Sequence, residues 1–346
     1  MGAGGKASNS VFVTARILFE PQSNAQNDGF THNDALRHHR GAATLRTLWP
    51  SKTPMELRYV IVVAIIVSFV LVHVNQRLAS PVVAIADRWL RWIIFPIVGA
   101  WLCRDFDLVD RPMWVIAVAG FLLWFLVETL YNWLAIAALS VSPFPLFPRY
   151  ALNSSGEEWP VQPRFLRIRE WLRAQGFRQV QALKAEVGGD IYLRVSVYQD
   201  EAALLRVQVT FLPQNNGAID VCYSLTSLTH DGARYVTDNL YIPFGGFYPE
   251  DWFVDRRPCT RSLPRLLALH RRRIAAVGRA LVPFMVEPLA ELNDAQRELD
   301  RVNTELGFLN PQGAREDHGK ISNEGRYRVW KEIWTLNYLG RAARYD

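Results

Sequence analysis

The sequence has few cysteines and few lysines. Its three cysteines, Cys103, Cys222 and Cys259, lie far apart and form no C-x-x-C pair. A disulfide framework and a structural zinc site are therefore not predicted, and so sparse a cysteine content fits a reducing compartment. Lysine occurs only five times, so the net charge of +6 comes almost entirely from arginine. This positive charge favours anionic surfaces as partners.

Recognisable catalytic motifs are also missing. The sequence contains no serine-elbow pattern, no H-E-x-x-H and no dinucleotide glycine fingerprint. A catalytic reading would need a histidine, an acid and a thiol to meet in space. The candidates for those roles are His230 or His270, Asp238 or Asp251, and Cys259. Because no pattern brings them together, we predict no catalytic residue, no cofactor and no metal site, and we favour a binding function.

The longest apolar runs all lie before residue 142. Residues 57–79 and 113–141 are each long enough to cross about 30 Å of hydrocarbon. They predict two transmembrane helices in residues 51–141, the transmembrane region. No apolar stretch near residue 1 has the form of a signal peptide, and residues 1–50, rich in Asn, Gln, Gly and His, predict a flexible tail.

The segment between the two runs, residues 81–104, is harder to interpret. It is apolar in its second half, but Asp87, Arg88 and Arg91 precede that half and are costly in lipid. A third span, a hairpin broken at Pro96 and Gly99, and an interfacial helix are all open. Arginines flank both long runs, which favours an even number of spans with both termini cytoplasmic. We therefore expect a partial-depth element in a multi-pass protein of a bacterial inner membrane.

Glu128 is the one formal charge inside the second long run, and Asn132 follows it one helical turn later. An ionisable residue in a span is by default a functional hypothesis. These two intramembrane polar residues therefore predict a proton or ion role. The alternative is that Glu128 faces a neighbouring helix or lies at a shallow depth in a tilted span.

The remainder of the chain predicts an α+β fold, with an antiparallel sheet flanked by helices. A proline-rich linker is expected at 142–163, a helix at 164–176 and strands at 191–199, 205–211, 219–225 and 234–242. Period-two alternation of apolar and polar residues gives each strand one buried face. We assign residues 164–282 to a cytoplasmic domain and 283–346 to a C-terminal helical segment. The final helix suits either a membrane interface or a docking surface.

Residues 238–259 form the most distinctive predicted loop, with paired glycines among many aromatic residues. Phe244, Phe247, Tyr248 and Trp252 could line a pocket or hold a partner. The alternative is that they only cap an open face of the sheet.

An arginine-rich helix is predicted at 262–282. Its basic residues surround an apolar stripe and suit anionic headgroups or acidic partners, or else simply face solvent. These candidate binding residues are Arg265, Arg271, Arg272 and Arg273.

The sequence as a whole favours a membrane-anchored, non-enzymatic protein. Its basic domain would bind a protein partner, a second copy of the chain or the membrane lipid, and nucleic acid is not expected as a partner. The alternative is a membrane-linked enzyme with its substrate pocket at loop 238–259.

Overall fold

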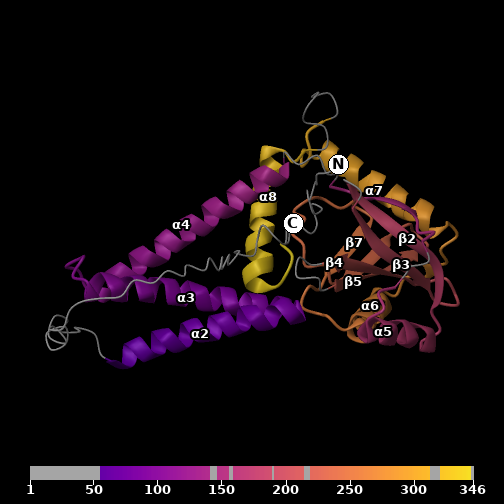
Figure 1. The fold of residues 1–346 in the computed structure, drawn as a ribbon. Helices are drawn as coiled ribbons and strands as arrows, with labels where there is room; N and C mark the ends of the chain where they lie inside the picture. The colour runs from indigo at the N-terminus through magenta and orange to yellow at the C-terminus, as the bar shows by residue number, and fades with distance from the viewer. Residues whose placement is uncertain are drawn as a thin grey trace, which may run out of the picture.

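A computed structural model of the chain describes six stretches, residues 55–140, 146–155, 159–188, 191–213, 219–311 and 320–343. The tail expected at 1–50 lies outside them. A helical bundle extends to one side of the molecule and a sheet domain occupies the other, with helix α8 between them (Figure 1).

The bundle consists of α2 (Met55–Leu78), α3 (Pro81–Asp105) and α4 (Met113–Ser140). Helix α3 runs back between its two neighbours, so α2 begins at the end of the bundle remote from the sheet (Figure 1). Residues 81–104 thus belong to one continuous helix, not to a broken hairpin. Pro96 is tolerated inside it, and α4 approaches closely there, because a Cβ on Gly120 would lie 3.2 Å from the Cα of Pro96.

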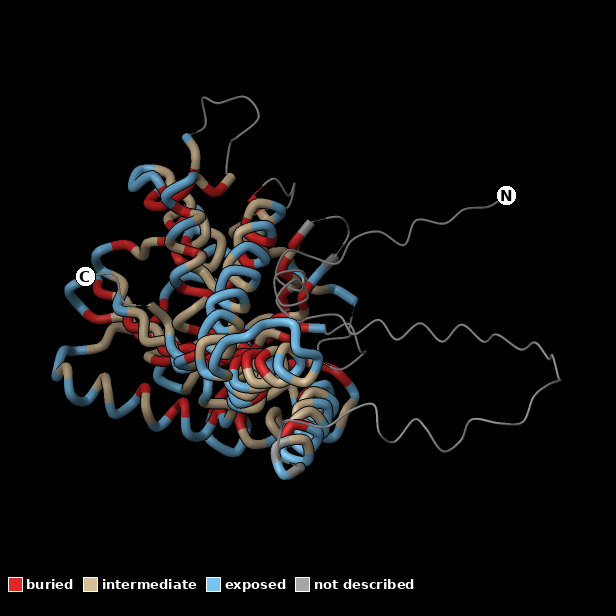
Figure 2. The backbone as a smooth tube through the Cα atoms, turned by 90° about the vertical axis from the view of Figure 1, so that its left-hand side faces the viewer, coloured by how far each residue is buried: buried red, intermediate tan, exposed pale blue. Residues whose placement is uncertain are grey.

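Only α2 and α4 are both long and apolar enough to cross a membrane, among the described residues. Their large apolar side chains are mostly exposed. In Figure 2, which looks from the remote end of the bundle, the helices nearest the viewer are drawn mostly in pale blue and tan. A soluble monomer rarely exposes so continuous an apolar surface.

Two ion pairs join charged residues of the bundle. The carboxylate of buried Asp87 accepts a hydrogen bond from the Ser68 hydroxyl at 2.6 Å and pairs with Arg91 at 2.8 Å. Arg58 and Asp105 form a second ion pair, 2.8 Å long, at the remote end. Two of the three residues that made α3 costly in lipid, Asp87 and Arg91, therefore compensate each other.

One mixed sheet forms the second half of the molecule, in the strand order β1-β2-β3-β4-β5-β6-β7, with β8 paired to β5. All neighbours are antiparallel except β6 and β7, which are parallel. The strands are β1 (Arg149–Leu152), β2 (Arg178–Gly188), β3 (Ile191–Gln199), β4 (Arg206–Pro213), β5 (Ile219–Thr229), β6 (Arg234–Asp238), β7 (Trp252–Arg256) and β8 (Leu281–Val282).

The antiparallel sheet and the flanking helices are as predicted, but several bounds differ. The predicted strand at 234–242 ends at Asp238, and the segment expected as a linker contains β1. The arginine-rich helix, predicted to reach 282, ends at Val277 because Gly278 takes a left-handed conformation (φ +66°). The chain then returns to the sheet as β8.

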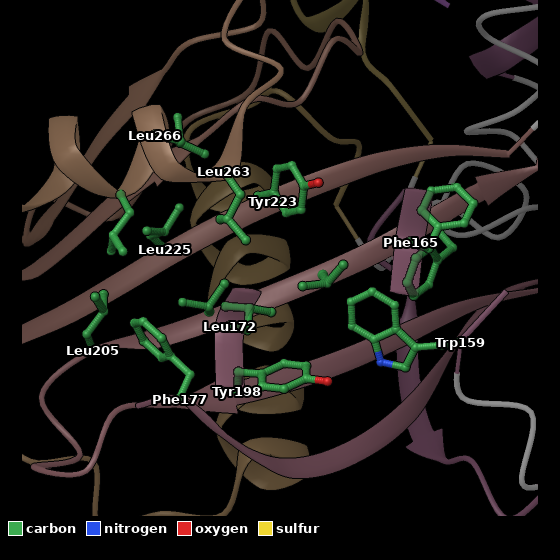
Figure 3. Packing of buried hydrophobic residues seen from close by; sticks show 14 residues of the cluster. Trp159, Phe165, Leu172, Phe177, Tyr198, Leu205, Tyr223, Leu225, Leu263 and Leu266 are labelled. Carbon is green, nitrogen blue, oxygen red and sulfur yellow. The ribbon is translucent and has the colours of Figure 1, made fainter. Parts of the chain in front are cut away.

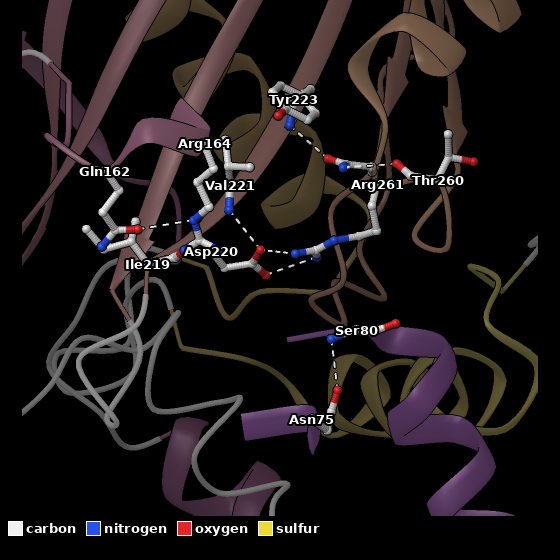
Figure 4. Close-up of polar contacts among 11 residues, drawn as sticks. Asn75, Ser80, Gln162, Arg164, Ile219, Asp220, Val221, Tyr223, Thr260 and Arg261 are labelled. Carbon is white, nitrogen blue, oxygen red and sulfur yellow. Dashed lines mark hydrogen bonds and ion pairs between the residues drawn. The ribbon is translucent and has the colours of Figure 1, made fainter. Parts of the chain in front are cut away.

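The face of the sheet that carries Val207, Val209 and Phe211 is here called the closed face. Helices α5 (Pro163–Ala174) and α6 (Leu263–Val277) cover it, and a continuous apolar core fills the space beneath them (Figure 3). A buried ion pair between Asp220 of β5 and Arg261 joins the sheet to the start of α6 (Figure 4).

The opposite face, which carries Gln208, Thr210 and Leu212, is here called the hollow face. Helix α7 (Pro288–Glu305) crosses it. Buried Glu291 of α7 pairs with Arg206 at 2.9 Å and also with Arg234. Both faces are therefore covered, whereas the alternation had predicted only one.

Helix α8 (Asn323–Trp334) continues into the π-helix η1 (Thr335–Leu339) and lies between α3 and α4. A separate apolar core joins Ile136 of α4 to Val329 and Ile333 of α8. The bundle and the sheet domain are thus packed together through α8, and the final helix docks on the bundle of its own chain.

Candidate functional site

The hollow face contains a cavity of about 260 Å³. Its floor is formed by the strands, its roof by the loop between β6 and β7, and its sides by α7 and by the chain on either side of residues 141–145. Most of the lining is apolar. The main lining residues are Leu139, Phe147, Leu193, Gln208, Thr210, Leu212, Cys222, Ser224, Asp238, Leu240, Ile242, Phe244, Tyr248, Arg256 and Leu299.

The roof exists because β6 and β7 are parallel, so residues 239–251 must cross back over the sheet. Asn303 of α7 clamps this loop, receiving the N–H of Phe247 at 2.7 Å and donating to its carbonyl oxygen at 2.9 Å. Gly245 has φ +69° and touches α8, where a Cβ would lie 2.7 Å from the backbone nitrogen of Val329. Only glycine fits this position, which explains why the first of the two adjacent glycines in the loop is Gly245.

Arg256 is the polar centre of the cavity, with a side chain only 6% exposed. It donates to the Tyr248 hydroxyl at 2.8 Å and to the Ile242 carbonyl at 3.1 Å. Its other neighbours are the carboxylates of Asp238 at 3.4 Å and Glu332 at 3.7 Å. This group of four side chains, Asp238, Tyr248, Arg256 and Glu332, is here called the arginine cluster.

Burial governs the protonation of the arginine cluster. It raises the pKa of Asp238 and the pKa of Glu332, and it raises the pKa of Tyr248 to about 12. The guanidinium of Arg256 acts in the opposite direction and lowers the pKa of both carboxyl groups, so it favours their charged forms. Since Glu332 belongs to α8, the cluster also connects the cavity to the helix that packs against the bundle.

A second cavity, of about 230 Å³, lies where α3, α4 and η1 meet, and is here called the junction cavity. Glu128 accepts hydrogen bonds there from the Trp92 indole at 2.8 Å and from the Tyr338 hydroxyl. Asn132 also lines this cavity and is only 4% exposed. Glu128 and Asn132 thus line the same cavity, and Glu128 contacts both α3 and η1.

The four predicted basic residues separate in the structure. Arg265, Arg271 and Arg272 are exposed on α6. Arg273 instead donates to the carbonyl oxygens of Val236 at 2.8 Å and Phe253 at 3.0 Å, and so holds the edge of the sheet.

The four aromatic candidates separate as well. Phe244 and Tyr248 line the hollow-face cavity. Phe247 lies outside it, 3.8 Å from the guanidinium of Arg328. Trp252 packs against the guanidinium of Arg234, 4.6 Å from the ring centre. Two of the four aromatic candidates therefore line the cavity, and the other two pack against arginines outside it.

The catalytic candidates do not come together. His270 is buried on the closed face, between the hydroxyls of Ser227 at 3.2 Å and Thr237 at 2.9 Å. Asp238 lies on the hollow face, while His230, Asp251 and Cys259 are exposed elsewhere. Among the described residues, no group of three His, Cys, Asp or Glu side chains is arranged to hold a metal ion.

Sequence reasoning did not identify Arg256, Glu332, Trp92 or Tyr338. The aromatic positions of the last helix were a signal for Tyr338, but its partner Glu128 lies 210 residues away. Comparison of the chain with protein-family models, with curated proteins and with solved structures found no match.

Proposed function

We propose that this protein is a membrane-anchored binding protein whose hollow-face cavity takes an uncharged amphiphilic small molecule. The apolar surfaces of α2 and α4 support the anchor. Helix α3 lies between them along its length, so we infer that it crosses the bilayer with them, which gives three spans instead of the two favoured by the flanking charges. The two ends of the bundle then lie on opposite sides of the membrane.

The observation that carries the binding proposal is the cavity itself. A largely apolar space with a few convergent polar groups is the usual form of a small-molecule site. Here Asp238, Tyr248 and Arg256 supply polar groups at one place, and apolar side chains of the roof and strands line much of the rest. Leu139, near the end of α4, also lines the cavity, which suits a ligand that arrives from the bilayer.

An uncharged polar end fits the arginine cluster better than a charged one. Arg256 already donates to two oxygens and lies between two carboxylates, so its charge is compensated within the protein. An added carboxylate would be buried beside Asp238, and an uncompensated buried charge is costly. A hydroxyl or ester group can bond to the same side chains without that cost.

Cys222 lines the cavity and can report its occupancy. In a Cys103→Ser/Cys259→Ser variant of the full chain in lipid nanodiscs, we expect decanol to slow alkylation of Cys222 by a maleimide. The slowing should be about tenfold at ten times the Kd. Decanoate should slow the reaction much less at the same concentration, because its charge is disfavoured. Equal protection by both probes would refute the preference, and no protection by either would refute the site.

Two tryptophan substitutions make the test specific. Leu212→Trp should fill the cavity, slow the alkylation without ligand and remove the effect of decanol. Val161→Trp lies at a position 88% exposed and should leave both rates unchanged. Extraction of native membranes with alkaline carbonate tests the anchor separately, since the chain should stay in the pellet.

A second candidate function uses the exposed basic face of α6. Arg265, Arg271 and Arg272 remain available to an acidic protein partner or to anionic headgroups. If this face binds lipid, Gln at all three positions should lower flotation with phosphatidylglycerol vesicles in low salt. The matched substitution Arg167→Gln on α5 should have a smaller effect.

A further inference from the structure

We propose that the junction cavity binds the headgroup of a phospholipid that carries a primary amine, of the phosphoethanolamine type. The cavity brings together two arginines, a carboxylate and carboxamides at the base of an exposed apolar bundle. The inference depends on the proposed membrane insertion but not on the hollow-face cavity.

Arg88 and Arg91 of α3 both line the junction cavity and lie one turn apart on one helical face. Arginine binds phosphate through several hydrogen bonds at once. Trp124 lines the same cavity, and its indole N–H has no hydrogen-bond acceptor among the described residues. These donors suit the phosphate of a headgroup.

Glu128 and Asn132 supply the complementary acceptors. A carboxylate offers about four lone-pair positions, and Trp92 and Tyr338 occupy two of those on Glu128. The amide of Asn132 is buried against the cavity and makes no hydrogen bond with any residue in the described ranges. A primary ammonium could bond to both groups, whereas a trimethylammonium has no N–H to donate.

The charge balance selects a zwitterion. Arg88 and Arg91 are balanced by Glu128 and by Asp87, which pairs with Arg91. A headgroup with a phosphate and an ammonium keeps this balance, whereas an anionic glycerol headgroup adds an uncompensated charge.

The depth of the cavity also fits a headgroup. Arg88 lies about 25 Å along α3 from Asp105, at 1.5 Å per residue. If Asp105 marks one boundary of a hydrocarbon core about 30 Å thick, Arg88 lies close to the other. Val127 and Tyr131 of α4 line the cavity and are exposed, so acyl chains have an apolar surface beside the headgroup.

The test is lipid retention by the purified full chain. The protein is reconstituted in nanodiscs of equal parts phosphatidylcholine, phosphatidylethanolamine and phosphatidylglycerol. It is then extracted in mild detergent, and the bound lipid is quantified by mass spectrometry. We expect phosphatidylethanolamine to be enriched about tenfold over each of the other two lipids. This factor corresponds to the free energy of about one hydrogen bond to a charged group. Water-soluble glycerophosphoethanolamine should not displace it at equal concentration, because it lacks acyl chains.

Variants locate the binding. Asn132→Leu breaks no described hydrogen bond and should abolish the enrichment without lowering the Tm. Glu128→Gln should reduce the enrichment of phosphatidylethanolamine over phosphatidylcholine, and Arg88→Gln should lower retention of all three lipids. The controls are Glu56→Gln on α2 and Arg104→Gln near the remote end of α3, which should change nothing.

Three results would overturn the inference: equal retention of the three lipids, enrichment that survives Asn132→Leu, or full displacement by the soluble headgroup. Failure of the chain to enter nanodiscs would overturn the membrane proposal as well. Normal insertion without enrichment would overturn this inference alone.

Discussion

The two faces of the sheet are built from alternate residues of the same strands but are filled differently. On the closed face, Val207, Val209 and Leu225 are completely buried in an apolar core under two helices. On the hollow face, Gln208, Thr210 and Leu212 border a cavity. The closed face is filled by apolar side chains, whereas the hollow face has a cavity with charged side chains beside it.

The difference shows how one sheet can serve both stability and binding. The closed face meets amphipathic helices whose apolar side chains are buried with those of the strands in one core. The hollow face is covered partly by the loop between β6 and β7. The cavity lies between this loop and the strands. The arginine cluster holds that loop in place, because Arg256 bonds to Ile242 and Tyr248 within it.

The largest expected effect comes from the hollow face. Arg256→Met should lower the free energy of unfolding by about 3–5 kcal/mol, because it leaves Asp238 and Glu332 buried without their cation. Urea unfolding of the full chain in detergent measures the loss. Adding Asp238→Asn and Glu332→Gln to this variant should recover most of it.

The matched control for Arg256 is Arg301→Met on α7. Arg301 forms ion pairs with Glu298 and Glu305 but is exposed, so its loss should cost far less than the loss of Arg256. A cost below 1 kcal/mol for Arg256→Met would show that the cluster does not hold the roof.

Substitution of one leucine on each face tests the difference in packing directly. Leu225→Ala on the closed face should cost about 2–5 kcal/mol, since it leaves a void among fully packed side chains. Leu212→Ala on the hollow face should cost at least about 1 kcal/mol less, because Leu212 already borders empty space. Equal losses in urea unfolding would show that the hollow face is as well packed as the closed one.

The central strands were predictable because their alternation is strong. Strand β2 was missed because its hollow-face positions include the small residue Ala185 and alternate with charged Lys184 and Glu186. Strand β7 is only five residues long and pairs in parallel with β6. No tight turn joins the two strands, so the sequence has no local signal for β7.

The cavities could not be predicted from local sequence. The parallel pairing of β6 and β7 sets Arg256 directly beside Asp238, while Glu332 arrives from a helix much later in the chain. Sequence could mark Glu128 as an ionisable group in an apolar run. Its partners Trp92 and Tyr338 come from two other elements, and only tertiary packing joins them.

The smallest expected effect is a pH dependence of the closed face. Burial, together with the charges of Arg273 and Arg271, lowers the pKa of His270 to about 4. The folded state therefore favours the neutral imidazole, whereas the unfolded chain titrates near 6.5. The stability that this preference contributes is complete above pH 6.5 and falls as the pH drops toward 4. At pH 5 the loss should be about 2 kcal/mol relative to pH 7.

The measurement is the difference in free energy of unfolding between the wild type and His270→Gln at pH 7 and pH 5. The carboxyl groups of Asp238 and Glu332 have raised pKa values in the folded protein. Their contribution to the free energy of unfolding is therefore largest at low pH and is lost as the pH rises. Both carboxyl groups are present in the wild type and in His270→Gln, so their effect cancels when the two free energies of unfolding are subtracted. His230→Gln, at an exposed position, should follow the wild type. If the stability of His270→Gln changes with pH as that of the wild type does, the closed face does not hold a neutral histidine.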